Sequence, residues 1–123
     1  MRRMNLLEAC ARAAHAQNNI FCRAVGDVPS PAWEDLTPAQ RVGTLKGAEH
    51  ALAGGTPEAS HELWMASRIA EGWTFGPVKS FTEKTSPNLV PYAELSPAQR
   101  AKDALFQQTM RTMAAILGPV LPG

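Results

Sequence analysis

The chain has 123 residues, of which 45% are hydrophobic and 19% are charged, so it is long enough for one globular domain with its own core. Its formal net charge of +1 excludes a general basic field that would recruit nucleic acid or an anionic membrane, so any anion site must be local. Two cysteines are too few for a disulfide framework, and no run approaches the roughly 20 apolar residues of a membrane span, which favours a soluble protein in the reducing cytoplasm.

Four helices are predicted in chain order, and three of them begin with the same kind of cap. The helices are expected over about residues 3–25, 38–53, 57–71 and 97–117, where apolar residues recur at helical spacing. Thr37, Thr56 and Ser96 are each followed by proline, which is typical of an N-cap and the first helical position. A glycine follows the expected end of every helix, which is typical of a helix C-terminus.

Two of these caps lie in nearly identical strings, LTPAQR (36–41) and LSPAQR (95–100). In each string a hydroxyl residue is followed three positions later by glutamine, which predicts a capping box. Because the flanking sequences differ, we interpret the likeness as one capping solution used twice rather than as an internal repeat.

Apolar residues at helical spacing are expected in the core, together with the tryptophan of the loop after the first helix. The expected core residues include Cys10, Cys22, Trp33, Val42, Leu45, Ala48, Leu52, Ala101, Leu105, Met113, Ile116 and Leu117. Cysteines in such positions are buried structural thiols rather than nucleophiles.

The pattern changes between the third and fourth helices. The segments WTFGPV (73–78) and NLVPY (88–92) are short and rich in aromatic or β-branched residues, and the polar segment KSFTEKTSP joins them. They predict two brief strands or extended arms, with Trp73 and Phe75 packed under the helices. The fold class is therefore α+β and predominantly helical.

The sequence lacks the usual patterns of catalysis. The string HELWM begins like a zinc-protease helix, but Met65 stands where the second metal-binding histidine is needed. His15 and His50 lie on different predicted helices, without acidic or cysteine ligands at metal-site spacing. We expect no catalytic residue, no metal and no cofactor, and thus no enzyme.

The third predicted helix has two different faces. One is apolar and built from small residues, and consists of Ala59, Leu63, Ala66 and Ala70; the other holds His61, Trp64, Arg68 and Glu71. The first face is expected to pack on the core. An indole beside a guanidinium can stack on a planar ring while the cation meets a carboxylate or phosphate. In the alternative interpretation, the extended arms cover Trp64 and make it part of the core.

Cations follow on the arm and at the start of the last helix. Lys79 and Lys84 flank the polar loop, while Arg100 and Lys102 open the fourth helix. Each alone is an ordinary solvated cation. Together with Arg68 they could form a small anion site without raising the net charge.

The string HELWMASRIAEGWTFGPVK, followed by PNLVPYAELSPAQRAKDALF, resembles the RyR domain, which occurs as a repeat in ryanodine receptors and in small stand-alone bacterial and phage proteins. The matching elements are His61, Trp64, Gly72-Trp73, the turn 76–79, the segment 89–92, and residues 95–103. The resemblance is strong over 56–117 and looser over 1–55, and 118–123 form a tail, so that 1–123 is one domain. Ser86 and Asn88 replace the histidine and cysteine that the family often has there.

The resemblance implies a compact helical fold with a small antiparallel two-stranded β element, and a binding module without catalysis. Family members are associated with nucleotide-like small molecules. By position, the implied ligand-binding residues are His61, Trp64, Arg68, Lys79, Lys84 and Tyr92. Receptors carry the repeat in tandem, so a homodimer is a further hypothesis, with Trp64 from two subunits around one cleft.

Two functions remain open. In the first, the chain binds a nucleotide or nucleotide-derived signal, with an adenine-type base on Trp64 and phosphates on Arg68 and the lysines. It would then sequester that signal, as a phage sponge against host defence does in the host cytoplasm. In the second, the same surface docks a protein partner. A pocket with convergent cations favours the first, and a flat apolar patch favours the second.

Overall fold

The computed structural model describes residues 4–121. In order, its elements are α1 (Leu6–Val25), η1 (Trp33–Asp35), α2 (Pro38–Leu52), α3 (Pro57–Ala70), β1 (Thr74–Phe75), β2 (Thr85–Ser86), η2 (Tyr92–Glu94) and α4 (Pro97–Leu117), where η marks a 3-10 helix. The predicted bounds of the last three α-helices are confirmed to within one residue. The predicted start at Arg3 lies outside the described residues; α1 begins at Leu6, because the Asn5 side chain caps the Glu8 N–H.

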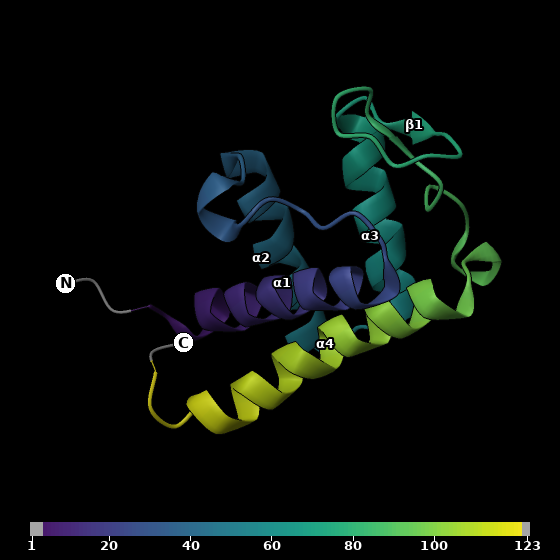
Figure 1. Cartoon of the computed structure of the whole chain (residues 1–123). Helices are drawn as coiled ribbons and strands as arrows, with labels where there is room; N and C mark the ends of the chain where they lie inside the picture. Colours follow the sequence, from purple (N-terminus) through teal and green to yellow (C-terminus); the bar gives the residue numbers. More distant parts are fainter. Residues whose placement is uncertain (1–3, 122–123) are drawn as a thin grey trace.

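The helices form one layer of two antiparallel helices with a second pair on one side of it. α1 and α4 pack along each other, whereas α2 and α3 rise apart from that layer, with the β element at the far end of α3 (Figure 1). The buried core cluster joins α1, α2 and α4, and consists of Cys10, Ala11, Ala14, Ala48, Ala51 and Met110. Small side chains at most of these positions let the helices approach closely.

Several expected core positions are instead exposed. Val42 is 49% exposed, Leu105 40% and Ile116 66%, although we predicted all three to be buried. On α4 the buried face holds Gln107 and Met110. The polar Gln107 is accommodated there because its side-chain amide donates a hydrogen bond to the Ser60 hydroxyl. Apolar residues lie on both faces of α4, so spacing alone did not identify the face that packs.

The β element differs from the prediction in the position of its second strand and in the direction of pairing. β1 and β2 are parallel, with the Thr74 N–H donating to the Lys84 carbonyl and the Gly76 N–H to the Ser86 carbonyl. The predicted second strand at 88–92 is wrong, because the polar joining segment turns back and supplies Thr85–Ser86 itself. Gly76 is required there, since an added Cβ would lie 2.8 Å from Cβ of Thr85. Phe75, predicted to pack under the helices, is 61% exposed, while Trp73 is buried as expected.

The two capping strings belong to a longer structural likeness that begins with a buried histidine. His15 in α1 has its Nε2 2.8 Å from the carbonyl oxygen of Pro31, and His61 in α3 has its Nε2 2.8 Å from that of Val90. The sequence interpretation, which limited the repetition to the cap, was too narrow. It missed the histidines because they lie 16 and 29 residues away from their carbonyl partners.

The likeness continues into the following helix. Two residues after each carbonyl, an aromatic residue opens a 3-10 helix and packs against the histidine ring. The ring centroids of His15 and Trp33 are 5.9 Å apart, and those of His61 and Tyr92 are 6.1 Å apart. A buried leucine and the capped α-helix come next. We call α1–η1–α2 (6–52) the first half-unit and α3–η2–α4 (57–117) the second half-unit.

The two caps are not identical in detail. Thr37 and Gln40 form the complete predicted capping box. Ser96 accepts from the Gln99 N–H, but the Gln99 side chain reaches Asp27 after α1 instead of closing the box. That amide thus ties the start of the second half-unit's last helix to the end of the first half-unit's first helix.

Candidate functional site

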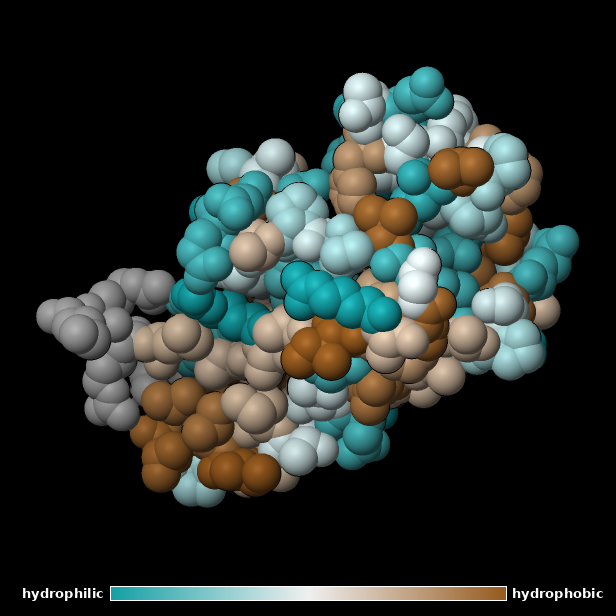
Figure 2. Space-filling view, in the orientation of Figure 1, coloured by the Kyte–Doolittle hydropathy of each residue, from teal (hydrophilic) through white to brown (hydrophobic). Residues whose placement is uncertain are grey.

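A cleft of about 870 Å³ lies between the two half-units, in the recess between α2 and α3 that Figure 2 shows. Equivalent residues of both half-units line it, namely His15 and His61, Leu36 and Leu95, and Gln40 and Gln99. The cleft is therefore built on the repeated frame, with α2 as one wall and α3 with the start of α4 as the other.

The α3 wall is turned differently from the prediction. Leu63 is 51% exposed, and Ala66 and Ala70 are also exposed; all three line the cleft instead of packing on the core. His61, expected on the outer face, is only 5% exposed. The reason is tertiary: the bond from His61 to the Val90 carbonyl holds that face of α3 against the segment that leads into η2.

His61 serves mainly to hold this arrangement. A carbonyl oxygen only accepts, so His61 Nε2 carries the hydrogen in the bond to Val90. Its ring stacks on the indole of Trp64, with centroids 5.5 Å apart and 27° between the planes. One part of the half-buried indole is thereby covered, and Trp64 also lines the cleft.

Asp103 lies behind His61 on the first turns of α4. Its Oδ2 is 3.8 Å from His61 Nδ1, too far for a hydrogen bond, and within residues 4–121 this buried oxygen has no hydrogen-bond partner. Burial raises the pKa of the Asp103 carboxyl, while His61 and Lys102 oppose the shift. Asp103 also lines the cleft and its side chain is 25% exposed, so the accessible part of the carboxylate can accept a hydrogen bond from a ligand N–H.

Arg68 stands between the two tryptophans of this region. Its guanidinium carbon is 4.8 Å from the ring centroid of Trp73 and 5.8 Å from that of Trp64, and the side chain is only 16% exposed. Its Nη1 lies 3.8 Å from Oε2 of Glu71. Burial lowers the pKa of Arg68, and Glu71 opposes that shift. An arginine remains charged under these conditions, so the rings and Glu71 hold a partly desolvated cation at the cleft.

Two lysines complete a cationic cluster, which we define as Arg68, Lys79 and Lys102. Lys79 Nζ donates to the carbonyl of Val28 at 2.7 Å, and Lys102, 12% exposed, lies 3.5 Å from Asp27. Burial lowers the pKa of Lys79, the charges of Lys102 and Arg68 lower it further, and Asp27 opposes the shift. Lys79 is thus repelled by both of the other cations of this cluster, which also line the cleft, and an anion bound among them would relieve that repulsion.

Two of the predicted ligand-binding residues lie elsewhere. Lys84 is exposed and donates to the carbonyl of Glu71, outside the residues that line the cleft. Tyr92 packs against His61 and likewise does not line it. The structure therefore brings His61, Trp64, Arg68 and Lys79 to one cleft, and leaves Lys84 and Tyr92 apart.

The opposite wall was missed by the sequence interpretation. Gly43, Thr44 and Gly47 of α2 line the cleft and leave its volume open. A side chain at Gly47 would meet no atom within 4 Å of its Cβ. Glycine inside a helix costs about 1 kcal/mol relative to alanine, so two glycines four residues apart were a signal that α2 passes close to something or borders a cavity.

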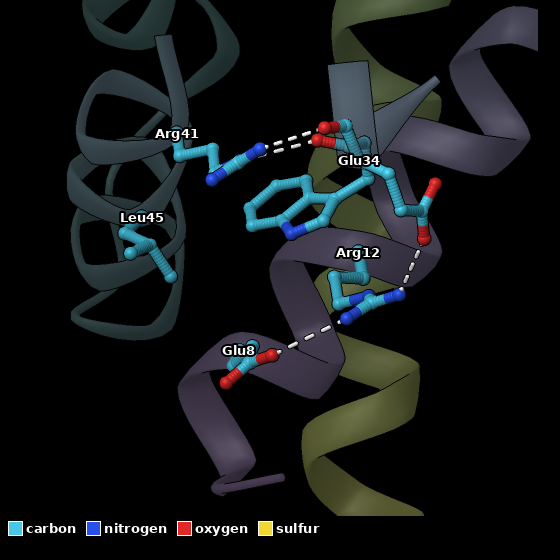
Figure 3. Close-up of a pocket in the computed structure, with 6 residues that line it drawn as sticks. Glu8, Arg12, Glu34, Arg41 and Leu45 are labelled. Atoms are coloured by element: carbon cyan, nitrogen blue, oxygen red, sulfur yellow. Dashed lines mark hydrogen bonds and ion pairs between the residues drawn. The ribbon is translucent and has the colours of Figure 1, made fainter. Parts of the chain in front are cut away.

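A second hollow of about 430 Å³ lies on the first half-unit and is lined by Glu8, Arg12, Trp33, Glu34, Arg41 and Leu45 (Figure 3). Arg12 is 3.4 Å from Glu8 and 2.8 Å from Glu34. Arg41 donates to the carbonyls of Trp33 and Glu34. Since two carboxylates balance the two guanidinium groups, this hollow has no excess charge for an anion.

The described residues offer no other obvious chemistry. Within 4–121, His, Cys, Asp and Glu side chains do not gather in a group of three that could hold a metal ion. No helix in the described part of the chain combines the length and apolar character needed to cross a membrane.

The chain matches the model of a known protein family. A family model described as the RyR domain aligns with residues 41–118, well over half of the chain. The match includes most of α2, all of α3, the β element and α4, and hence both walls of the cleft.

Proposed function

The chain belongs to the RyR domain family, and on that premise we propose that its α2–α3 cleft binds a nucleotide or a nucleotide-derived signal molecule. The observation that carries the proposal is the cationic cluster of Arg68, Lys79 and Lys102 in the lining of a cavity of about 870 Å³. Small-molecule sites typically have volumes of about 300–1,000 Å³ and a few convergent polar groups.

Phosphate groups would lie against the cationic cluster. The residues that line the cleft include four cations, namely the cluster and Lys46, against the two carboxylates of Glu71 and Asp103, so the lining keeps an excess of positive charge. Arg68 supplies a planar fork for phosphate oxygens, and Lys79 and Lys102 act as point charges. Because these side chains are largely removed from water, each charge contributes more than it would on an open surface.

The base would lie against Trp64. His61 already stacks on this indole, so the base would use the part of the ring that His61 leaves open to the cleft. The Asp103 carboxylate would then accept from an exocyclic amino group, as an adenine-type base provides. The bare wall of Gly43 and Gly47 would leave room for the sugar and base between the helices.

One observation favours the second candidate function, docking of a protein partner. Val42 on α2 and Leu63 on α3 are both about half exposed and line the same cleft from opposite walls. A helix or strand of a partner could insert its apolar side chains between them. Such an interaction would depend on Leu63 and be indifferent to Lys79, which is the reverse of the dependence expected for a nucleotide.

The experiment is a thermal-shift screen of the purified protein against mono-, cyclic and dinucleotides, followed by calorimetric titration of any that bind. Ligand at about 100 times its Kd should stabilise the fold by about 2.7 kcal/mol. Lys79→Met should weaken binding at least about tenfold, because it removes one charged phosphate contact. Lys84→Met is the matched control: it removes an exposed lysine outside the cleft and should leave Kd unchanged.

A variant that fills the cleft tests whether binding needs its open volume, without changing any charge. Gly47→Leu adds an apolar side chain where the structure has open space, and should leave the fold intact, because leucine is also the better helix former. We expect it to abolish nucleotide binding. Equal effects of Lys79→Met and Lys84→Met, together with full binding by Gly47→Leu, would refute the proposal.

The proposed output of binding is sequestration of the signal in the cytoplasm. A sponge holds its ligand without changing it, so ligand released by heat denaturation should be chemically intact by mass spectrometry. Recovery of a hydrolysed or rearranged product would contradict sequestration and indicate an enzyme.

A further inference from the structure

The outward face of α4 is unusual for an exposed helix surface. From Ala104 to the end of the helix, its exposed residues are Ala104, Leu105, Gln108, Thr112, Ala115 and Ile116. Leu105 is 40% exposed and Ile116 66%. Figure 2 shows hydrophobic side chains gathered over the carboxyl-terminal end of this helix. None of these six residues is charged.

Charge is missing from this face for a structural reason. The one charged side chain between Ala104 and Leu117 is Arg111, and its guanidinium turns inward to the carbonyls of Ala51 and Gly55. The corresponding helix of the first half-unit is different, since the exposed residues of α2 include Lys46 and Glu49. An uncharged face is unsuited to nucleic acid or to an acidic or basic peptide, and it brings no like charges together when it meets itself.

The side chains on this face are complementary to those of a second copy of the same helix that runs in the opposite direction. When the six residues are paired about a point near residue 110, Leu105 falls opposite Ala115, Ile116 opposite Ala104, and Gln108 opposite Thr112. Each large apolar side chain thus meets an alanine, and the two polar residues meet each other. Two antiparallel copies of the helix related by a two-fold axis would have this register.

We propose that this face of α4 is an interface with a second copy of the same chain, formed by antiparallel packing of α4 against α4 of the partner. The interface is distinct from the α2–α3 cleft and does not depend on the ligand. The six residues span about 18 Å of helix, so the buried surface falls below the about 1,200 Å² of standard interfaces and the dimer should be weak, with Kd in the micromolar range or above.

The test exploits the register. Ala104→Glu alone places a carboxylate against Ile116 of the partner, and Ile116→Lys alone places an ammonium against Ala104 of the partner. Each single change should weaken dimerisation at least about tenfold, because a charge is buried without a partner. The double variant Ala104→Glu with Ile116→Lys should restore much of the affinity, since both opposite-charge pairs then form between chains. The two positions are about 18 Å apart within one helix and cannot pair there.

Sedimentation velocity of the full chain from micromolar to millimolar concentration gives the readout. Thr82→Glu, an exposed loop substitution of the same charge, is the control and should leave the dimer unchanged. Helical circular dichroism and melting temperature confirm that every variant is folded. A wild-type chain that stays monomeric throughout overturns the proposal. So does a dimer unaffected by Ala104→Glu, or a double variant no better than the singles.

Discussion

The two half-units share the histidine bond, the 3-10 helix and the capped helix, but the two contacts between them differ: one is tightly packed and the other is open. α1 of the first half-unit packs closely on α4 of the second and makes most of the core (Figure 1). The counterpart contact, between α3 of the second half-unit and α2 of the first, stays open as the cleft. The same arrangement thus provides stability where side chains fill the contact, and a binding volume where they do not.

The difference lies in three pairs of corresponding residues. Counting from the shared cap, Gly43, Thr44 and Gly47 of α2 correspond to Lys102, Asp103 and Phe106 of α4, and all six line the cleft. One half-unit provides empty space at these positions, and the other provides a cation, a carboxylate and an aromatic ring. The comparison teaches that the repeated frame sets positions, and that the side chains at those positions divide the roles.

The largest expected effect tests whether the buried leucine after each 3-10 helix contributes equally to stability in the two half-units. Leu36 and Leu95 occupy the same position after their 3-10 helices and are 6% and 5% exposed. Leu36→Ala and Leu95→Ala should each lower the free energy of unfolding by about 2–5 kcal/mol through loss of buried volume. Urea denaturation followed by circular dichroism measures both. Val42→Ala, half exposed, should change stability by less than about 0.5 kcal/mol, and a similar loss there would undermine the reasoning from burial.

The next effect tests the repeated histidine bond. His15→Ala and His61→Ala each leave a carbonyl group without its donor, which should cost about 1–3 kcal/mol. His61→Ala should cost more than His15→Ala, because it also removes the stack on Trp64. His→Gln at either position keeps an N–H donor and should recover part of the loss. Wild-type melting temperatures for both alanine variants would show that the shared bond is unimportant.

The smallest expected effect concerns Asp103, which carries a charge where the corresponding residue of the first half-unit, Thr44, does not. The raised pKa of Asp103 means that the folded protein binds this proton more tightly than the unfolded chain, so the ionised carboxyl destabilises the fold above that pKa. Asp103→Asn should therefore raise the melting temperature at neutral pH, and the gain should vanish as pH falls below the usual Asp value of about 3.9. Thermal melts across this range measure it. Nucleotide binding should weaken in the same variant, whereas Thr44→Val at the corresponding position should not show this pH dependence.

Prediction from the sequence succeeded best where the information is local. The helix boundaries after Thr37, Thr56 and Ser96 follow from a hydroxyl cap and a proline that act within one turn. The cationic candidates Arg68 and Lys79 were found by residue type and do reach the cleft, while Lys84, chosen by the same criterion, does not. Residue type alone could not separate them, because the turn between β1 and β2 decides where each lysine lies.

The sequence by itself determined the helices, their caps, the burial of Cys10, Cys22 and Trp73, and the membership of the family. Only the tertiary structure decided that both predicted faces of α3 border the cleft, which face of α4 remains outside, and that two distant histidines bond equivalent carbonyls. The physical reason is range: capping and hydrophobic periodicity act within a few residues, whereas the orientation of a helix depends on partners that the chain brings from 16 to 60 residues away.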